Sequence, residues 1–302
     1  MAGMTPADLD VRHAFADVNG LRMHYVEAGP PARTGVPPIV LLHGFPEMWW
    51  SWRYQIRALT AAGYRVIAPD LRGYNETEAR GPYDLDTLRD DVVALLDHRE
   101  VDKAIVVSHD WGGAVAWHLA GTRQQRCAKL VAMNCPHPLV FQRAINKWSQ
   151  ARRSWYIFFF QIPWLPETLL AARGGDAVIR MLRSAAVDKK NFGRAELEPF
   201  AVAVQKPGHA KAMLEWYRAA FRAGLRARRA GAPAASGHST ITIPTLVIWG
   251  MKDIALNYDD IVPGTERYAP GMEVHTLADC GHFVQQEQPE EVNRLLLEWI
   301  RR

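Results

Sequence analysis

Asp110 occupies the position at which this sequence is best suited to covalent chemistry. It lies in the segment Ser-His-Asp-Trp-Gly-Gly, 108–113, between an apolar run at 104–107 and an apolar, helix-like stretch at 114–120. A buried strand, a tight turn and a helix form the setting of a nucleophile elbow, which presents its middle residue for attack. Small flanking residues suit such a turn because its backbone is crowded and strained. We therefore predict that Asp110 is a nucleophile.

The carboxylate of Asp110 restricts the reactions that this turn can support. A serine in its place would attack acyl carbons, whereas a carboxylate attacking an ester would give an anhydride, a poor intermediate. Attack of a carboxylate on an electrophilic sp³ carbon gives an alkyl ester, which water can then cleave. Opening of an epoxide and displacement of a halide are reactions of this kind.

Two simpler interpretations of the segment have to be weighed. Ser108, His109 and Asp110 look like a catalytic triad, but neighbours in sequence point apart at a strand end, and triads are assembled in space. Ser108 takes a place where glycine is usual, which a second small residue tolerates. Asp110 could alternatively do no more than cap the following helix.

His282 is the best candidate for the general base that an alkyl ester needs. It lies in a glycine-containing loop directly after the last strand-like run of the chain. The other histidines fit this role less well, because they fall inside that last run, in the helix after Asp110 and in the later helical region: His275, His118 and His209.

Asp253 is the best candidate for the acid that orients His282. It follows the strand-like run 246–249 and a short Gly-Met-Lys turn. Asp279 is closer to His282 in sequence, but an aspartate at that point is better explained as a turn residue. Asn134 also follows a strand-like run, but its amide carries no charge.

Water attack on the ester also requires N–H groups that stabilise the developing oxyanion. The residue after the nucleophile supplies one such group, here Trp111. The loop after the strand-like run 39–42 supplies the other, and Phe45 is the natural donor because Gly44 allows a tight approach. A plain strand-to-helix loop would explain Gly44 and Pro46, but not their match to the elbow.

Three segments together resemble the epoxide hydrolases of the α/β-hydrolase fold: His-Gly-Phe-Pro-Glu at 43–47, the elbow at 108–113 and Gly-His-Phe at 281–283. The resemblance covers about 15–300 of the chain. Its first two motifs are typical of the branch with an aspartate nucleophile, which epoxide hydrolases share with haloalkane and fluoroacetate dehalogenases. The chain order of nucleophile, acid and base is also that of the α/β-hydrolase arrangement. The resemblance implies a mostly parallel sheet with a helical cap inserted after strand 6.

Epoxide hydrolases of this family use two cap tyrosines that hydrogen-bond the epoxide oxygen and protonate the developing alkoxide. The resemblance implies Tyr217, in Glu-Trp-Tyr-Arg at 215–218, where the family has Asn-Trp-Tyr-Arg and Glu215 is a departure. It also implies Tyr156, five residues before Gln161. Tyrosine suits the role because it is a neutral donor near neutral pH. Each tyrosine could alternatively only pack within the cap.

An apolar cavity between cap and core is the expected binding place for a small apolar epoxide. Its expected lining includes Trp155, Trp111, Phe45 and Pro46. The expected reaction converts the epoxide to a vicinal diol through an ester on Asp110, which water activated by His282 then cleaves. We expect no cofactor and no metal ion.

Dehalogenation of a haloalkane or a haloacid by the same Asp-His-Asp set is the main alternative. Haloalkane dehalogenases commonly carry asparagine where this chain has Phe45. Fluoroacetate dehalogenases typically place arginine after the nucleophile, where this chain has Trp111. A hormone-receptor-like binding protein of the same fold is a third alternative, but such receptors usually keep a serine nucleophile.

The elements that must position these residues alternate between strands and helices. Continuous apolar runs predict buried, mostly parallel strands, and 21–27 alternates like a hairpin strand. The predicted parallel strands are 38–42, 65–68, 103–107, 129–133, 244–249 and 273–277. Helices are predicted at 48–62, 85–98 and 290–300.

The long middle region has helical patterns but no convincing strand. We therefore predict a core formed by 1–136 and 241–302, and a helical cap at 137–240. A stretch rich in Gly, Ala and Pro at 231–237 predicts a flexible return linker. The most apolar stretch, 155–165, is too short to span a bilayer and is broken by prolines, so we expect it to be buried or to line a cavity.

Four arginines of the predicted cap fall near helical spacing, namely Arg218, Arg222, Arg226 and Arg229. A stripe that binds an anion is one interpretation. A solvated helix face is the one we favour, because charged residues on a helix usually face water.

The overall composition is that of an ordinary globular protein. The chain has 302 residues, of which 48% are apolar and 23% charged, and its net charge is +4. A charge this small predicts neither nucleic-acid nor membrane binding. Three cysteines without metal-ligand spacing, Cys127, Cys135 and Cys280, predict a reducing compartment and no disulfide framework. With no signal-peptide pattern at the N-terminus, we expect a cytoplasmic protein, and a homodimer stays open.

Overall fold

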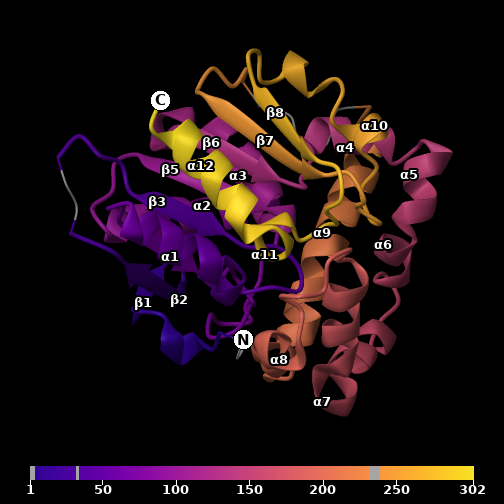
Figure 1. Cartoon of the computed structure of the whole chain (residues 1–302). Helices are drawn as coiled ribbons and strands as arrows, with labels where there is room; N and C mark the ends of the chain where they lie inside the picture. The colour runs from indigo at the N-terminus through magenta and orange to yellow at the C-terminus, as the bar shows by residue number, and fades with distance from the viewer. Residues whose placement is uncertain (1–3, 32–33, 232–238) are drawn as a thin grey trace.

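An eight-stranded, mostly parallel sheet lies at the centre of the structure, a computed structural model that describes residues 4–31, 34–231 and 239–302 (Figure 1). Its strand order is β1-β2-β4-β3-β5-β6-β7-β8. The first four strands are β1 (Arg12–Val18), β2 (Leu21–Ala28), β3 (Ile39–Leu42) and β4 (Val66–Pro69). The other four are β5 (Ala104–His109), β6 (Cys127–Met133), β7 (Thr245–Gly250) and β8 (Glu273–Leu277).

The pairing of the strands follows from their apolar sequence. From β4 to β8 every neighbouring pair is parallel, whereas the pairs β1–β2 and β2–β4 are antiparallel. Every residue of β3, β4, β5 and β7 is buried. Strands buried on both faces need apolar side chains on both, which is why these runs do not alternate.

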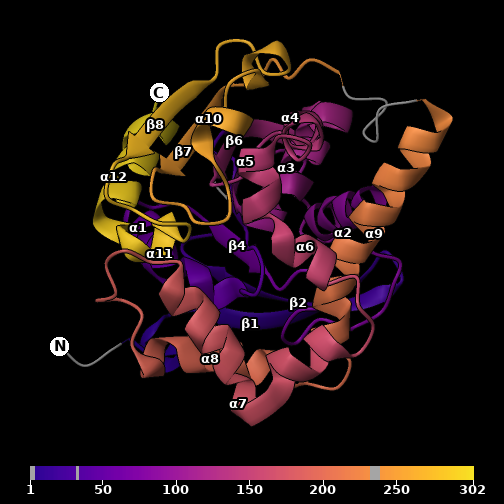
Figure 2. The ribbon, with the colours of Figure 1, turned by 90° about the vertical axis from the view of Figure 1, so that its right-hand side faces the viewer.

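Helices cover both faces of the sheet, as Figure 2 shows. On one face α1 (Arg53–Ala61) packs against α12 (Pro289–Ile300), and on the other α2 (Leu85–His98) packs against α3 (Asp110–Thr122). The short helices α10 (Tyr258–Ile261) and α11 (Val284–Glu287) follow β7 and β8. This arrangement confirms the predicted α/β-hydrolase fold.

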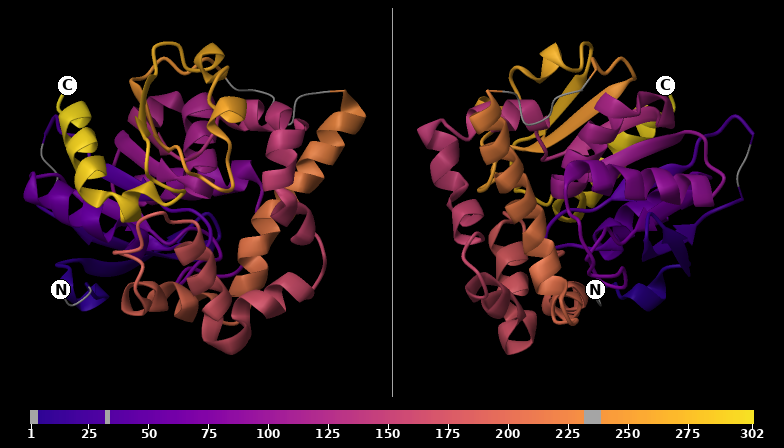
Figure 3. Two further views of the ribbon diagram at one scale, coloured as in Figure 1. Left: turned by 45° about the vertical axis from the view of Figure 1, so that its right-hand side comes forward. Right: turned by 180° about the vertical axis from the view of Figure 1, so that it is seen from behind.

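A helical insertion follows β6, as predicted, and stands against one end of the sheet (Figure 3). Its helices are α4 (Pro138–Ala144), α5 (Trp148–Arg153), α6 (Trp155–Phe159), α7 (Leu165–Ser184), α8 (Arg194–Val204) and α9 (His209–Ala230). The last three contact one another. Most of the predicted linker at 231–237 lies outside the described residues.

Two local predictions need correction. The helix predicted at 48–62 begins as a 3₁₀ turn at Trp49–Trp52, and α1 starts only at Arg53. The apolar stretch 155–165 is not uniformly buried, because α6 and the loop after it pack on one side only. Successive side chains of a helix point in directions about 100° apart, so the five aromatic residues of 155–160 cannot all face one way.

The arginine pattern on α9 is split by the structure. Arg222, Arg226 and Arg229 are exposed, as expected for a solvated face, but Arg218 is buried. Among the described helices, none is long and apolar enough to cross a membrane.

Candidate active site

Asp110 lies in a strained turn between β5 and α3. Its φ of +47° is a left-handed conformation that residues with a side chain rarely adopt. The backbone around it is crowded, since a Cβ on Gly112 would lie 2.3 Å from the carbonyl oxygen of Leu42. A Cβ on Gly44 would lie 2.5 Å from the Cβ of Asp110. The turn therefore has the crowding expected of a nucleophile elbow, and glycine is required where it is closest.

His282 lies between two carboxylates. Its Nδ1 is 2.7 Å from Oδ2 of Asp253, and its Nε2 is 3.6 Å from Oδ2 of Asp110. These residues follow β8, β7 and β5, three strands that end at the same edge of the sheet. The structure thus brings together the three side chains that the sequence nominated as base, acid and nucleophile.

Asp253 is held by donors on both of its oxygens. Its Oδ1 accepts from the backbone N–H groups of Ala255 at 2.8 Å and Leu256 at 3.0 Å. Its Oδ2 accepts from Nδ2 of Asn134 at 2.7 Å, and Oδ1 of Asn134 in turn accepts from Gly250 N at 2.9 Å. Asn134 is no acid, but it fixes the carboxylate that faces His282.

The charges of these groups support one another. Burial alone would raise the pKa of Asp110, but the hydrogen bond and charge of His282 hold it below its usual range. Burial alone would likewise lower the pKa of His282, but the charge of Asp253 and the hydrogen bond to Asp110 raise it well above its usual range. Both shifts favour the charged forms, a carboxylate on Asp110 and an imidazolium on His282.

The backbone N–H of Phe45 donates to Oδ1 of Asp110 at 2.8 Å. Trp111 follows directly at the start of α3, and its ring is partly buried. Phe45 and Pro46 are joined by a cis peptide bond, and both are buried. The predicted donor loop thus lies against Asp110, with Oδ1 on the Phe45 side and Oδ2 on the His282 side.

The two cap tyrosines lie side by side although about sixty residues separate them. The ring centroids of Tyr156 on α6 and Tyr217 on α9 are 6.0 Å apart. Tyr217 also packs edge-on against Trp111 at 5.0 Å and Phe45 at 5.2 Å. Since both of these belong to the core around Asp110, Tyr217 reaches the site from the cap.

Both phenols remain protonated in this surrounding. Burial, followed by the negative charge of Asp110, raises the pKa of Tyr156 and of Tyr217 well above the usual value of tyrosine. A neutral phenol close to a carboxylate is a hydrogen-bond donor.

Arg218 joins the two segments that carry the tyrosines. It is buried on α9, directly after Tyr217, and its Nε donates to the carbonyl oxygen of Phe160 at 2.8 Å. A second nitrogen donates to the carbonyl oxygen of Ile162 at 2.8 Å, and a third to Glu167 at 2.6 Å. Glu215, the departure from the family pattern, lies 3.4 Å from the same guanidinium.

The sequence did not single out a buried network beneath the site. Oε2 of Glu47 lies 2.8 Å from Nδ1 of His109 and accepts from Gly44 N at 2.8 Å. Nε2 of His109 lies 2.9 Å from the carbonyl oxygen of His282. Glu47 therefore ties the Phe45 loop, the elbow and the histidine loop together. Its place in the His-Gly-Phe-Pro-Glu motif was the signal that could have found it.

The residues set aside in the sequence have structural partners elsewhere. Ser108 donates to the carbonyl oxygen of Val131, and His118 pairs with Asp86. His209 lies 3.2 Å from the carbonyl oxygen of Thr77. His275 lies within β8, and Asp279 is an exposed turn residue.

Trp155 does not lie where the sequence analysis expected it. Its side chain is 63% exposed, although the neighbouring Tyr156 is partly buried and reaches Tyr217. Adjacent residues of a helix face different directions, so only one of the two can point into the site. The prediction that Trp155 lines the substrate cavity is therefore wrong.

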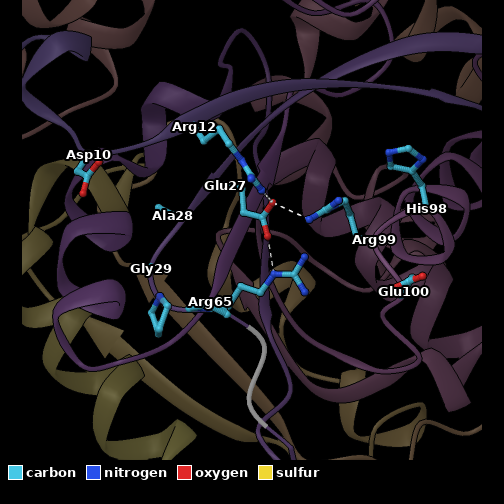
Figure 4. A pocket seen from close by; sticks show the side chains of 11 residues that line it. Asp10, Arg12, Glu27, Ala28, Gly29, Arg65, His98, Arg99 and Glu100 are labelled. Atoms are coloured by element: carbon cyan, nitrogen blue, oxygen red, sulfur yellow. Dashed lines mark hydrogen bonds and ion pairs between the residues drawn. The ribbon is translucent and has the colours of Figure 1, made fainter.

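A pocket of about 750 Å³ lies elsewhere, near the amino end of β4. Figure 4 shows its central feature, the carboxylate of Glu27 with the guanidinium groups of Arg12, Arg65 and Arg99 around it. Burial alone would raise the pKa of Glu27, but hydrogen bonds from Arg65 and Arg12 lower it. The carboxylate of Glu27 thus links three side chains, Arg12 on β1, Arg65 directly before β4 and Arg99 directly after α2.

Within the described part of the chain, no group of three or more His, Cys, Asp or Glu side chains is placed to hold a metal ion.

The sheet, the elbow and the carboxylate at its tip define a protein of the α/β-hydrolase class. The α/β hydrolase fold family matches residues 37–289. The AB hydrolase superfamily protein YfhM of Bacillus subtilis is 40% identical over 296 residues, covering 96% of this chain and 98% of its own length. Epoxide hydrolase 4 of Homo sapiens is 35% identical over 292 residues, covering 94% of this chain and 76% of its own.

A solved structure leads to the same group. The crystal structure of Bacillus megaterium epoxide hydrolase in complex with an inhibitor matches with a TM-score of 0.85 and 27% identity, over 96% of this chain and all of that one. The chain belongs to the epoxide hydrolase family of the α/β-hydrolase fold.

Proposed function

We propose that this protein hydrolyses small apolar epoxides to vicinal diols through a covalent ester on Asp110. The observation that carries the proposal is the pair of neutral phenols, Tyr156 and Tyr217, which meet beside the nucleophile from two separate cap helices. An opening epoxide leaves its oxygen attached to carbon as a strong base, so a positioned proton donor lowers the barrier.

In the first step Oδ2 of Asp110 attacks an epoxide carbon. We assign Oδ2 because Oδ1 is occupied by the N–H of Phe45. A C–O bond forms to the enzyme while the ring C–O bond breaks, and its electron pair goes to the epoxide oxygen. That oxygen takes a proton from Tyr156 or Tyr217. Two donors stabilise this charge more in the transition state than in the ground state.

In the second step His282 acts as the base. Esterification removes the negative charge of Asp110 beside His282, one of the two charges that raise its pKa. The protonated imidazole therefore becomes easier to deprotonate once the ester exists, and its proton returns to the tyrosinate that the first step leaves. Its Nε2 takes a proton from water, the oxygen of that water attacks the ester carbon, and Phe45 N–H, with Trp111 N–H, stabilises the oxyanion. Collapse breaks the bond between the carboxyl carbon of Asp110 and Oδ2, and the leaving alkoxide takes a proton from His282 to give the diol. The new carboxyl group then returns its proton to the imidazole, which restores the carboxylate.

Aromatic packing around the tyrosines supports an apolar substrate. Phe160 packs against Phe45 with ring centroids 5.6 Å apart and against Tyr217 at 5.0 Å. With Trp111 these rings leave few groups that could bind a charged ligand.

The decisive experiment is a single turnover in ¹⁸O-labelled water with styrene oxide and enzyme in excess. We expect the first diol released to carry an unlabelled new oxygen, because that oxygen comes from Asp110, and the label to enter the protein. Label in the first diol would refute the ester mechanism. A parallel panel of an aliphatic epoxide, a haloalkane and fluoroacetate identifies the leaving group, and halide release without diol formation would establish dehalogenation instead.

A further inference from the structure

The cap carries an unusual concentration of exposed apolar side chains. Among the described residues fourteen large apolar side chains are exposed, and seven of them lie between 148 and 169. They include Trp148, Trp155 and Trp164, exposed by 80%, 63% and 81%. We call the exposed apolar side chains of residues 148–169 the aromatic face. Exposed tryptophans grouped in this way mark an interaction surface.

The aromatic face is organised along a nearly continuous helical run. α5 and α6 are separated only by Ser154. Trp148, Arg152 and Trp155 follow one another at intervals of four and three residues, which places them on one side of that run. Figure 1 and the right-hand view of Figure 3 show α5 and α6 at the outer edge of the molecule, with α9 on their inner side.

The helical insertion that carries the aromatic face has a positive net charge. Residues 137–240 contain 17 lysines and arginines but only 6 aspartates and glutamates, a net charge of +11. The rest of the chain has 19 against 26, a net charge of −7. Arg152 on α5 is exposed, as are Arg143 on α4 and Arg173 on α7, the helices before and after α5 and α6. The acidic residue of this stretch, Glu167, is turned inward and paired with Arg218.

We propose that the aromatic face docks on an anionic lipid surface. Tryptophan favours the boundary between lipid and water, and each lysine or arginine near an anionic membrane adds to binding. A second copy of this chain is a poorer occupant, because a symmetric contact would bring two cationic caps together. An anionic bilayer complements both the apolar and the cationic character of the face.

The position of the face has a consequence for access to the site. α6 bears the outward Trp155 and, one residue later, Tyr156 of the candidate site. A docked cap would hold the site close to a lipid phase in which apolar epoxides dissolve. This consequence rests on the proposed function, whereas the docking itself does not.

Flotation of the full chain with vesicles tests the docking without any substrate. We expect binding to phosphatidylcholine vesicles that contain phosphatidylserine, at least about tenfold weaker binding to phosphatidylcholine alone, and loss of binding as salt is added. No binding to anionic vesicles at low salt would overturn the proposal. Equal binding to both vesicle types would also overturn it, because charge would then play no part.

Matched variants localise the contact. Trp148→Ser with Trp164→Ser should weaken vesicle binding at least about tenfold, whereas Val36→Ser with Val202→Ser, at exposed apolar positions elsewhere, should leave it unchanged. The double variant Arg152→Gln, Arg173→Gln should weaken vesicle binding by roughly fivefold per charge removed. Its control, Arg57→Gln with Lys103→Gln, removes two exposed charges of the core and should weaken vesicle binding less. Equal losses in a pair and its control would overturn the assignment to this face.

Two further measurements separate the docking from its rivals. Sedimentation could show that the parent is a dimer and that the Trp148→Ser, Trp164→Ser variant is a monomer. If the parent also fails to float with vesicles, the aromatic face is a contact between two copies of the chain and the proposal is wrong. Turnover of a water-soluble epoxide should be the same in that variant and the parent. If no epoxide is turned over but vesicles are bound, the proposed function fails while the docking stands.

Discussion

At the residue scale, the position of His282 between two carboxylates separates the two chemical steps. Its Nδ1 lies 2.7 Å from Asp253, and its Nε2 faces Oδ2 of Asp110 at 3.6 Å, next to the carboxyl group on which the proposed ester forms. The imidazole is therefore suited to the hydrolytic step.

The first prediction concerns His282→Gln. We expect the ester on Asp110 to form and persist, because general-base assistance worth roughly 10²–10⁴-fold is lost in the second step only. Intact-protein mass spectrometry should show an adduct equal to the mass of the epoxide. As a control, His275→Gln, within β8, should turn over normally. A His282→Gln protein without any adduct would contradict the assignment, provided that its circular dichroism is unchanged.

The second prediction is a pH dependence. Hydrolysis of the ester needs neutral His282, so its rate should rise with pH through the pKa of that imidazole and then level. The charge of Asp253 raises this pKa, so Asp253→Asn should move the rising limb of the rate to lower pH. It should also reduce the plateau rate, because the imidazole ring of His282 is then held less well. Single-turnover hydrolysis measured across pH checks both. A limb shifted to higher pH would refute the charge argument.

At the element scale, the reaction depends on α6 and α9 lying together. The third prediction is that Tyr156→Phe and Tyr217→Phe each slow alkylation by roughly tenfold or more. Because either phenol partly replaces the other, the double change should slow alkylation further, by about 10²–10⁴-fold. Rapid-quench measurement of ester formation with one epoxide checks this. Parental rates in the double variant would exclude the tyrosines as proton donors.

The fourth prediction concerns Arg218, which binds the carbonyl oxygens of Phe160 and Ile162 from α9. Arg218→Lys cannot make all of these bonds, so the two tyrosines should separate and alkylation should slow by roughly ten- to a hundredfold. Hydrolysis of the ester, which uses core residues, should change little. Arg222→Lys, at an exposed position on the same helix, is the control. Equal slowing of both steps would indicate general loss of structure instead.

At the scale of the whole molecule, one buried ion pair joins the sheet edge to its helical layer. Arg72, in the loop after β4, forms two hydrogen bonds of 2.6 and 2.7 Å with Asp91 on α2, and both side chains are buried. Removing one partner would leave the other charge buried without compensation.

The fifth prediction follows from this pair. Asp91→Ala should lower the free energy of unfolding by about 3–5 kcal/mol, because Arg72 stays buried and unpaired. Asp90→Ala, which removes a half-exposed partner of Arg89, should lower it by less than about 1 kcal/mol. Urea denaturation of both variants gives the comparison. Similar losses would show that burial of the Arg72 pair matters little.

The distribution of charge is also a property of the whole molecule. A net charge of +4 gave no reason to expect contact with membranes, but the average conceals a cationic cap on an acidic core. Only the structure shows that the exposed tryptophans belong to the cationic part.

The sequence by itself was sufficient to predict the fold and to single out Asp110, Asp253 and His282, three side chains that lie together in the structure. Buried parallel strands are continuous apolar runs, and a strained elbow requires small residues around its tip, so both leave local patterns. The residues at 108–113, Asp253 and His282 each follow such a run. Because parallel strands end at one edge of a sheet, their meeting could be anticipated.

Tertiary structure alone decided what depends on contacts between distant segments. Such contacts turn Trp155 outward while Tyr156 faces Tyr217, and they bury Arg218. They also make Asn134 a hydrogen-bond donor to Asp253. The network of Glu47 and His109 beneath the site depends on such contacts as well. Local sequence patterns report the period of a helix or strand, but which side of it meets a partner depends on packing between elements far apart along the chain.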